Sequence, residues 1–286
     1  MLFQGKIRIK MKNILIKVNS YDDLKYPIDG FILGVLGYSI MSPKAFSSDE
    51  IAEISKKYSD KKIFAELSVV VPNYKIEDYK STLNKLDKIG LSGIIVGDVA
   101  AITYNLKTPI ILNQMHLNNS SLTINHYYRN KVSGVILTND ITKDEINNIR
   151  KNTKALLFKE VFTLPHLSTS VRRLVSNYKD YFNINHESKD YFICEDNKDN
   201  YYHIVEDFYG THILGDKVLN LFDLIDDLDV DYMILNNYLL DKEKFKVVFD
   251  IFNNNDKSKA DYIKREFNTS DGFINKKTIY KVKKDE

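Results

Sequence analysis

Polar side chains stand at the ends of several short apolar runs, where they could bind or activate a ligand. Amides predominate, together with acids, a serine and a lysine: Glu66, Ser68, Asp98, Asn113, Gln114, Asn139, Asp140, Lys159, Glu160, Asn236 and Asn237. An amide-rich set can hydrogen-bond a planar ligand such as a nucleobase, or a carboxylate. Each of these residues has an alternative role, because a polar residue at a strand end also caps helices or contacts solvent.

Metal and nucleophile motifs are not evident among the remaining reactive residues. The six histidines contain no helical pair of the H-E-x-x-H type, so we expect no metal site. There is no G-x-S-x-G motif for a nucleophilic serine. Cys194 follows Ile193 in a strand-like run, which predicts a buried and unreactive thiol.

Arg172 and Arg173 lie in a helix-like segment that precedes an aromatic-rich stretch. Nine aromatic residues occur in the 32 residues from Tyr178 to Tyr209, about 28%, against 12% for the chain. Arginines can hold phosphate while aromatic rings stack on unpaired bases. The alternatives are a solvated arginine pair and aromatic side chains that pack the segment onto the rest of the fold.

The elements that must position these residues alternate along the chain. The apolar runs are those of strands buried on both faces: 14–18, 30–34, 63–69, 93–97, 109–113, 134–138, 155–159 and 231–235. The amphipathic segments between or after them predict helices: 47–58, 76–89, 117–129, 142–151, 218–228 and 242–252.

Eight strands alternating with helices predict an α/β fold, a (β/α)8 TIM-barrel-like domain over residues 11–260. An open doubly wound sheet is the alternative. Residues 168–215 interrupt the pattern as an insertion after the seventh strand, with a hairpin at 201–205 and 211–214. In a barrel this insertion would lie over the active-site end. Residues 1–10 read either as a tag or as native sequence, and 261–286 as a basic tail.

Composition limits the classes of function. Lys and Arg number 41 against 39 Asp and Glu, a net charge of +2, so a nucleic-acid surface would be a local patch. The single cysteine excludes a disulfide framework and an all-cysteine iron–sulfur site. No apolar run reaches the length of a membrane span, and we see no secretory signal. We therefore expect a cytoplasmic protein with no membrane association.

Several motifs, in order, resemble those of the U32 peptidase family, also called collagenase-like proteases, from about residue 11 to residue 281. They are Asp29–Gly34 with Phe46-Ser47, Val96-Gly97-Asp98, Gln114-Met115 with Asn118-Asn119, Arg172 or Arg173 with Ser176-Asn177-Tyr178, Glu206-Asp207 with Gly210–Ile213, and Asp271-Gly272-Phe273. The resemblance is nearest to the short, single-barrel bacterial branch linked to 5-hydroxylation of the tRNA wobble uridine. Phe162 and Thr163 stand where the family has His-Gly, and His166 stands at the position of a cluster cysteine.

The resemblance implies tRNA as partner, no tightly bound cofactor, and prephenate as an anionic co-substrate. It implies catalytic roles for Asp98, Gln114, Arg172 and Arg173. It also implies substrate contacts by a second set: Asn118, Asn119, Asn177, Tyr178, His166 and His212. Two alternatives stay open: a peptidase, with a metal or activated water, and a non-catalytic subunit that pairs with a fuller homologue.

Overall fold

Eight parallel strands form a closed barrel in the computed structural model, which describes residues 13–276 apart from 186, 187, 189, 195 and 197. Strand β1 pairs with both β2 and β14, and β14 pairs in turn with β8, which closes the ring. The barrel strands are β1 Asn13–Lys17, β2 Gly30–Val35, β4 Lys62–Leu67, β5 Gly93–Val96, β6 Ile110–Leu112, β7 Val132–Ile136, β8 Leu156–Thr163 and β14 Tyr232–Asn236. All eight predicted strands are present, and closure confirms the barrel over the open sheet.

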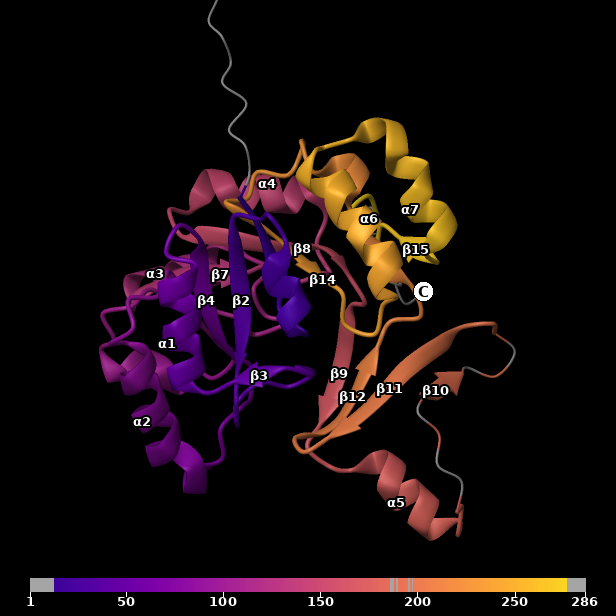
Figure 1. The fold of residues 1–286 in the computed structure, drawn as a ribbon, viewed down its shortest axis with the longest axis horizontal. Coiled ribbons are helices and arrows are strands. Elements are labelled where there is room, and N and C mark those ends of the chain that lie inside the picture. The colour runs from indigo at the N-terminus through magenta and orange to yellow at the C-terminus, as the bar shows by residue number, and fades with distance from the viewer. Residues whose placement is uncertain (1–12, 186–187, 189, 195, 197, 277–286) are drawn as a thin grey trace, which may run out of the picture.

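Helices between the strands pack around the outside of the barrel (Figure 1). Their bounds are α1 Ser48–Lys57, α2 Ile76–Leu86, α3 Ser121–Arg129, α4 Lys143–Asn152, α6 Lys242–Asn253 and α7 Ala260–Glu266. Short 3-10 turns lie at η1 Tyr21–Lys25, η2 Asn73–Lys75, η3 Val99–Tyr104, η4 Phe222–Leu224 and η5 Lys257–Lys259. Capping boxes begin α1, at Ser47 with Glu50, and α4, at Thr142 with Glu145. None of the described helices is long and apolar enough to cross a membrane.

The predicted helix at 218–228 is wrong. This segment forms strand β13 Val218–Asn220, antiparallel to β8, followed by η4. Strand β8 is eight residues long and extends past its last pairing with β7, at Phe158, while Phe162 still pairs with β14. Strand β13 therefore pairs with an edge that would otherwise carry unpaired backbone groups. The short strand β15 Thr269–Ser270 then pairs with β13, and the two-residue β3 Ala45–Phe46 pairs with β2.

The barrel interior has an apolar floor and a polar ring above it. The floor contains one buried residue from each strand: Leu15, Ile32, Phe64, Ile95, Ile111, Ile136, Phe158 and Ile234. Side chains alternate along a strand, so the residue two positions further on also points inward. Those positions, at the carboxyl ends of the strands, are Lys17, Gly34, Glu66, Gly97, Asn113, Thr138, Glu160 and Asn236.

The insertion after β8 forms a second, four-stranded antiparallel sheet in the order β10-β11-β12-β9. Its elements are β9 His166–Ser170, α5 Leu174–Tyr181, β10 Tyr191–Cys194, β11 Tyr201–Asp207 and β12 Gly210–Leu214. The predicted hairpin is therefore confirmed. Figure 1 shows the sheet beside the barrel and α5 at its far end. Cys194 is exposed, because β10 is a short edge strand, so the prediction of a buried thiol is wrong.

Truncation of the floor is expected to destabilise the barrel strongly. Phe64 is 1% exposed, and its ring centroid lies 5.5 Å from that of Phe158 and 5.6 Å from that of Tyr232. Phe64→Ala should lower the free energy of unfolding by about 3–5 kcal/mol, measured by chemical denaturation. The control Leu122→Ala, at a side chain that is 81% exposed, should change it by less than about 0.5 kcal/mol. A loss below about 1 kcal/mol at Phe64 would contradict the packed floor.

Candidate active site at the barrel mouth

A cavity of about 70 Å³ lies above the floor, and its lining includes every non-glycine member of the polar ring. Lys17 is paired with Glu66 across the ring, with 2.7 Å between Nζ and Oε2 and both side chains nearly buried. Glu160 accepts a hydrogen bond of 2.8 Å from the Asn139 amide. The cavity therefore presents amides, a hydroxyl and carboxylate oxygens, while its one lysine is already neutralised.

Buried polar networks hold this ring in place. The Lys159 ammonium donates to Asn139, and burial lowers the pKa of Lys159 to about 8 against the opposing effects of Glu160 and Asp140. On the other side, the Asn19 amide donates to Asn236 at 2.9 Å and to Asn237 at 2.7 Å. The ring amide of Asn236 therefore has a fixed orientation.

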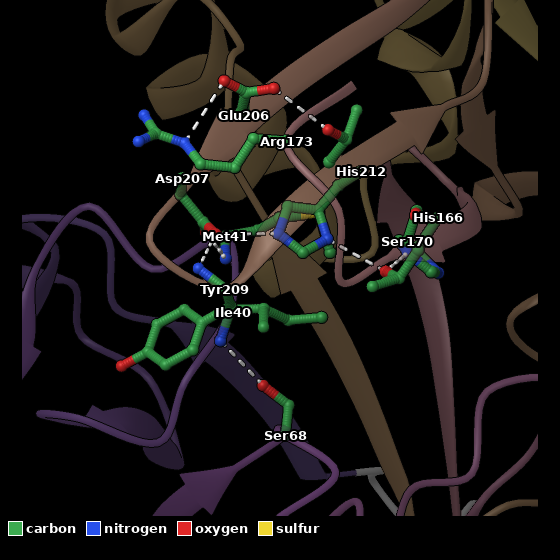
Figure 2. Close-up of polar contacts among 12 residues, drawn as sticks. Ile40, Met41, Ser68, His166, Ser170, Arg173, Glu206, Asp207, Tyr209 and His212 are labelled. Carbon is green, nitrogen blue, oxygen red and sulfur yellow. Dashed lines mark hydrogen bonds and ion pairs between the residues drawn. The ribbon is translucent and has the colours of Figure 1, made fainter. Parts of the chain in front are cut away.

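Four side chains connect the mouth to the insertion sheet, and we call them the relay: His166, Thr169, His212 and Asp207. Figure 2 labels His166, His212 and Asp207. His166 Nε2 lies 2.7 Å from Thr169 Oγ1, which lies 2.9 Å from His212 Nδ1. His212 Nε2 lies 3.0 Å from Asp207 Oδ1. His212 is fully buried, whereas His166 lines the cavity.

The two ends of the relay differ in charge. Burial, together with the nearby His212 and His116 rings and the Lys17 ammonium, lowers the pKa of His166 to about 4, and a backbone hydrogen bond with Ser168 opposes this weakly. Burial raises the pKa of Asp207, but hydrogen bonds from His212 and the Tyr209 N–H outweigh it, so the pKa of Asp207 is lowered. The relay thus runs from a neutral imidazole at the cavity to a carboxylate in the sheet.

His116 provides a second connection between the barrel and the insertion. Its Nδ1 lies 3.0 Å from Asp140 Oδ2, and its Nε2 lies 3.1 Å from the Leu167 carbonyl oxygen. The His116 and His166 rings are 6.4 Å apart. Contacts on both sides of this ring fix the start of β9 over the mouth.

Asp98 and Asn118 hold the backbone in the structure. Asp98 accepts hydrogen bonds of 2.8 Å from the Val71 and Ala100 N–H groups. Asn118 is fully buried, and its amide donates at 3.0 Å to the carbonyl oxygens of Leu112 and Ile136, at the ends of β6 and β7. Asn119 is exposed, while the buried Oε1 of Gln114 has no hydrogen-bond partner among the described residues.

The predicted residues of α5 lie apart from the mouth. Arg172, Arg173, Asn177 and Tyr178 are exposed, and none of them lines the cavity. The chain joins α5 to the sheet through Glu206, which accepts hydrogen bonds from the Val175 N–H at 2.8 Å and the Ser176 N–H at 3.2 Å. Thr211 bridges the Arg172 carbonyl and the Leu174 N–H, at 2.9 and 2.8 Å. The motif segments around Arg172 and Glu206 therefore meet at one junction.

The structure brings His166 and His212 together through Thr169, which the sequence did not single out. With Asp207 and His212, Thr169 forms a hydroxyl–base–acid arrangement, although no nucleophile–base pair was apparent in the sequence.

The sequence analysis also missed Lys17 as a residue of the site. A signal existed for Lys17, because it follows the apolar Leu15 by two residues on the first strand. Phe162, in place of a family histidine, is buried against Phe252 and Phe267.

The chain is a closed (β/α)8 barrel, and its polar ring lies at the carboxyl ends of the strands, where enzymes of this fold have their active sites. The family model described as "Peptidase family U32" matches residues 21–263. The chain therefore belongs to the U32 peptidase family.

Two relatives illustrate this membership. The chain is 24% identical over 285 residues to the tRNA hydroxylation protein P2 of Bacillus subtilis (strain 168), covering 87% of this chain and 92% of that protein. The solved structure of the U32 peptidase Mk0906 superimposes with a TM-score of 0.51 at 12% identity, over 79% of this chain and 92% of that one. The latter similarity supports the fold.

Neighbouring asparagines give a matched test of the structural role of Asn118. Asn118→Ala removes two buried hydrogen bonds and leaves carbonyl groups unpaired, so it should lower the free energy of unfolding by about 2–3 kcal/mol in urea denaturation. Asn119→Ala, at an exposed side chain, should change it by less than about 0.5 kcal/mol. Equal effects of the two substitutions would contradict the assignment.

The lowered pKa of His166 predicts a loss of stability in mild acid. Between pH 6.5 and 4 the unfolded chain binds a proton at this ring that the folded chain does not bind, so the free energy of unfolding falls as the pH falls. His166→Asn removes this contribution, and its denaturation midpoint should depend less on pH in that window. Parallel midpoint–pH curves for the two proteins would show that folding does not lower the pKa of His166.

Proposed function

We propose that this protein acts in tRNA modification, in the 5-hydroxylation of the wobble uridine. Family membership and the nearly full-length similarity to a protein named for tRNA hydroxylation support the reaction. The observation that carries the proposal is the cavity, whose lining suits a small planar ligand with alternating donors and acceptors. The edge of uracil has two carbonyl oxygens and an imide N–H between them.

Uracil suits the cavity because each polar group on its edge has a possible hydrogen-bond partner in the lining. The Asn113 and Asn236 amides can donate to carbonyl oxygens, while Glu160 and the free Nδ1 of His166 can accept from an N–H. Lys17 and Glu66 neutralise each other, so the lining does not favour a strongly anionic ligand. A neutral base is therefore the better occupant of the cavity.

The RNA backbone and the anionic co-substrate require a cationic surface elsewhere, and we propose α5 for this role. Arg172 and Arg173 are exposed just before α5, where Arg173 Nε lies 3.5 Å from Glu206 Oε1. The same segment carries the Tyr178 and Phe182 rings, whose centroids lie 4.6 Å apart. Guanidinium groups bind phosphate or carboxylate, and exposed aromatic rings stack on unpaired bases. Prephenate, a carboxylate, is the co-substrate that this proposal assigns to such a cationic surface.

A peptidase is the second candidate, and one observation favours it. Thr169, His212 and Asp207 present a hydroxyl, a base and an orienting carboxylate within hydrogen-bond distance of one another. In this alternative His212 would remove the Thr169 proton and Thr169 would attack a peptide carbonyl. A fluorophosphonate probe that labels Thr169, with hydrolysis of a peptide substrate, would support this candidate.

Deletion of the gene should remove 5-hydroxyuridine-type nucleosides from bulk tRNA, measured by nucleoside mass spectrometry, and the wild-type gene should restore them. Asn113→Leu keeps the volume of the side chain but removes a ring amide, so it should lower the restored level about 10-fold or more. His126→Gln, at an exposed position on α3, is the control and should restore fully. An unchanged nucleoside profile, in cells that contain the modification, would contradict the proposal.

The two arginines just before α5, Arg172 and Arg173, should affect the affinity for tRNA. Arg172→Ala with Arg173→Ala should weaken binding of the wobble-uridine tRNA about 10-fold and reduce the salt dependence of binding, because fewer phosphate contacts release counterions. Filter binding at several salt concentrations measures both quantities. If the affinity and the salt dependence of binding equal those of the wild type, Arg172 and Arg173 do not contact tRNA.

A further inference from the structure

The donor and acceptor roles along the relay follow from the charge of Asp207. Ionised Asp207 can only accept, and it accepts from the Tyr209 N–H at 2.8 Å and from His212 Nε2 at 3.0 Å. The Nε2 atom of a neutral His212 therefore carries the proton, and its Nδ1 is an acceptor. Thr169 must then donate its hydroxyl proton to His212 Nδ1 and accept from His166 Nε2. This leaves the Nδ1 atom of His166 without a proton.

The unprotonated Nδ1 of His166 lies at the cavity without a partner. His166 belongs to the lining, and Nδ1 is buried with no hydrogen-bond partner among the residues that the structure describes. A buried acceptor without a donor carries a desolvation cost that a ligand N–H or O–H would relieve. The relay thus fixes one tautomer of His166, and its unpartnered Nδ1 belongs to a residue that lines the cavity.

The two histidines differ in how well they tolerate a positive charge. Around His166 the rings of His116 and His212 each lie 6.4 Å away and Lys17 shares the cavity, although Glu66 and Glu160 also line it. His212 is fully buried but lies directly against Asp207. A proton taken up at the cavity is therefore better stabilised on His212 than on the ring that first receives it.

We propose that the relay is a proton wire, in which His166 Nδ1 accepts a proton from the ligand in the barrel mouth and the positive charge comes to rest on His212 beside Asp207. The ligand class is a molecule that presents an acidic N–H, O–H or C–H to the cavity. Its identity as a uridine base rests on the proposed function. His166 is the group that contacts the ligand, while Thr169, His212 and Asp207 are positioning residues.

The transfer balances without an electron carrier. The ligand proton binds His166 Nδ1, the His166 Nε2 proton passes to Thr169 Oγ1, and the Thr169 hydroxyl proton passes to His212 Nδ1. The products are a deprotonated ligand, a neutral His166 with the opposite tautomer, an intact Thr169 hydroxyl and a His212 imidazolium paired with Asp207. Reversal of the same steps returns a proton to a product.

Nitrogen-15 NMR of the histidine rings tests the wire in the free, full-length protein. At pH 7 His166 should show a single neutral tautomer protonated on Nε2, assigned by its loss in His166→Gln. On acidification the imidazolium signal should appear on His212 before His166. Thr169→Val keeps the shape of the side chain but breaks the wire, so His166 should become a mixture of tautomers, whereas Thr169→Ser should retain one.

The tRNA assay tests whether the wire is used. Removal of a proton acceptor commonly costs about 10²–10⁴-fold in rate. Thr169→Val and His166→Gln should therefore lower the restored nucleoside level about 10-fold or more, while Thr169→Ser and the control His126→Gln restore it. Circular dichroism establishes that each variant is folded.

The outcomes separate this inference from the proposed function. A His166 that is charged at pH 7, or a Thr169→Val protein with an unchanged His166 tautomer, overturns the wire whatever the tRNA assay gives. Full restoration by Thr169→Val also overturns it, as does a fluorophosphonate adduct on Thr169. If wild-type protein restores no hydroxylated nucleoside while the NMR results hold, the proposed function fails and the wire remains.

Discussion

The alternation of side chains along eight parallel strands is the constraint on which the rest of this structure depends. Once the barrel closes, every second residue must point into an interior just wide enough for side chains or one small ligand. The apolar floor, from Leu15 to Ile234, fills that space, and the next inward residue on each strand then faces the mouth. Polar groups at those positions are desolvated, held close together and oriented by one another. The Lys17–Glu66 pair is one result of this arrangement.

The insertion sheet uses the same alternation for a different purpose. Glu206 and Asp207 are adjacent on β11 and so project from opposite faces of the sheet. Glu206 accepts hydrogen bonds from the backbone N–H groups at the start of α5. Asp207 projects from the opposite face and is the last residue of the relay, which begins at His166 in the barrel mouth. Thr211 and His212 divide in the same way on β12. Two neighbouring pairs of residues thus connect one thin sheet both to the barrel and to α5.

The sequence supports the barrel better than the site, for physical reasons. Near-continuous apolar runs mark buried parallel strands, so all eight strands could be found. The helix expected at 218–228 fails because its tertiary partner, the overhanging end of β8, is invisible to local periodicity. Asp98 and Asn118 are polar residues at strand ends, yet their partners are backbone groups of other segments, which local sequence does not reveal. His166, Thr169 and His212 come together only through the pairing of β9 with β12 across more than 40 residues.

Closure between the first and last barrel strands also has a consequence for synthesis of the chain on the ribosome. Asn13 on β1 pairs with Tyr232 on β14, so a nascent chain that ends before Tyr232 presents an incomplete sheet with two open edges. Such edges are templates for pairing with other chains. Strand β14 must therefore leave the ribosome and pair with β1 before the early strands are protected from aggregation. The nascent chain is most prone to aggregate during translation of the residues before β14.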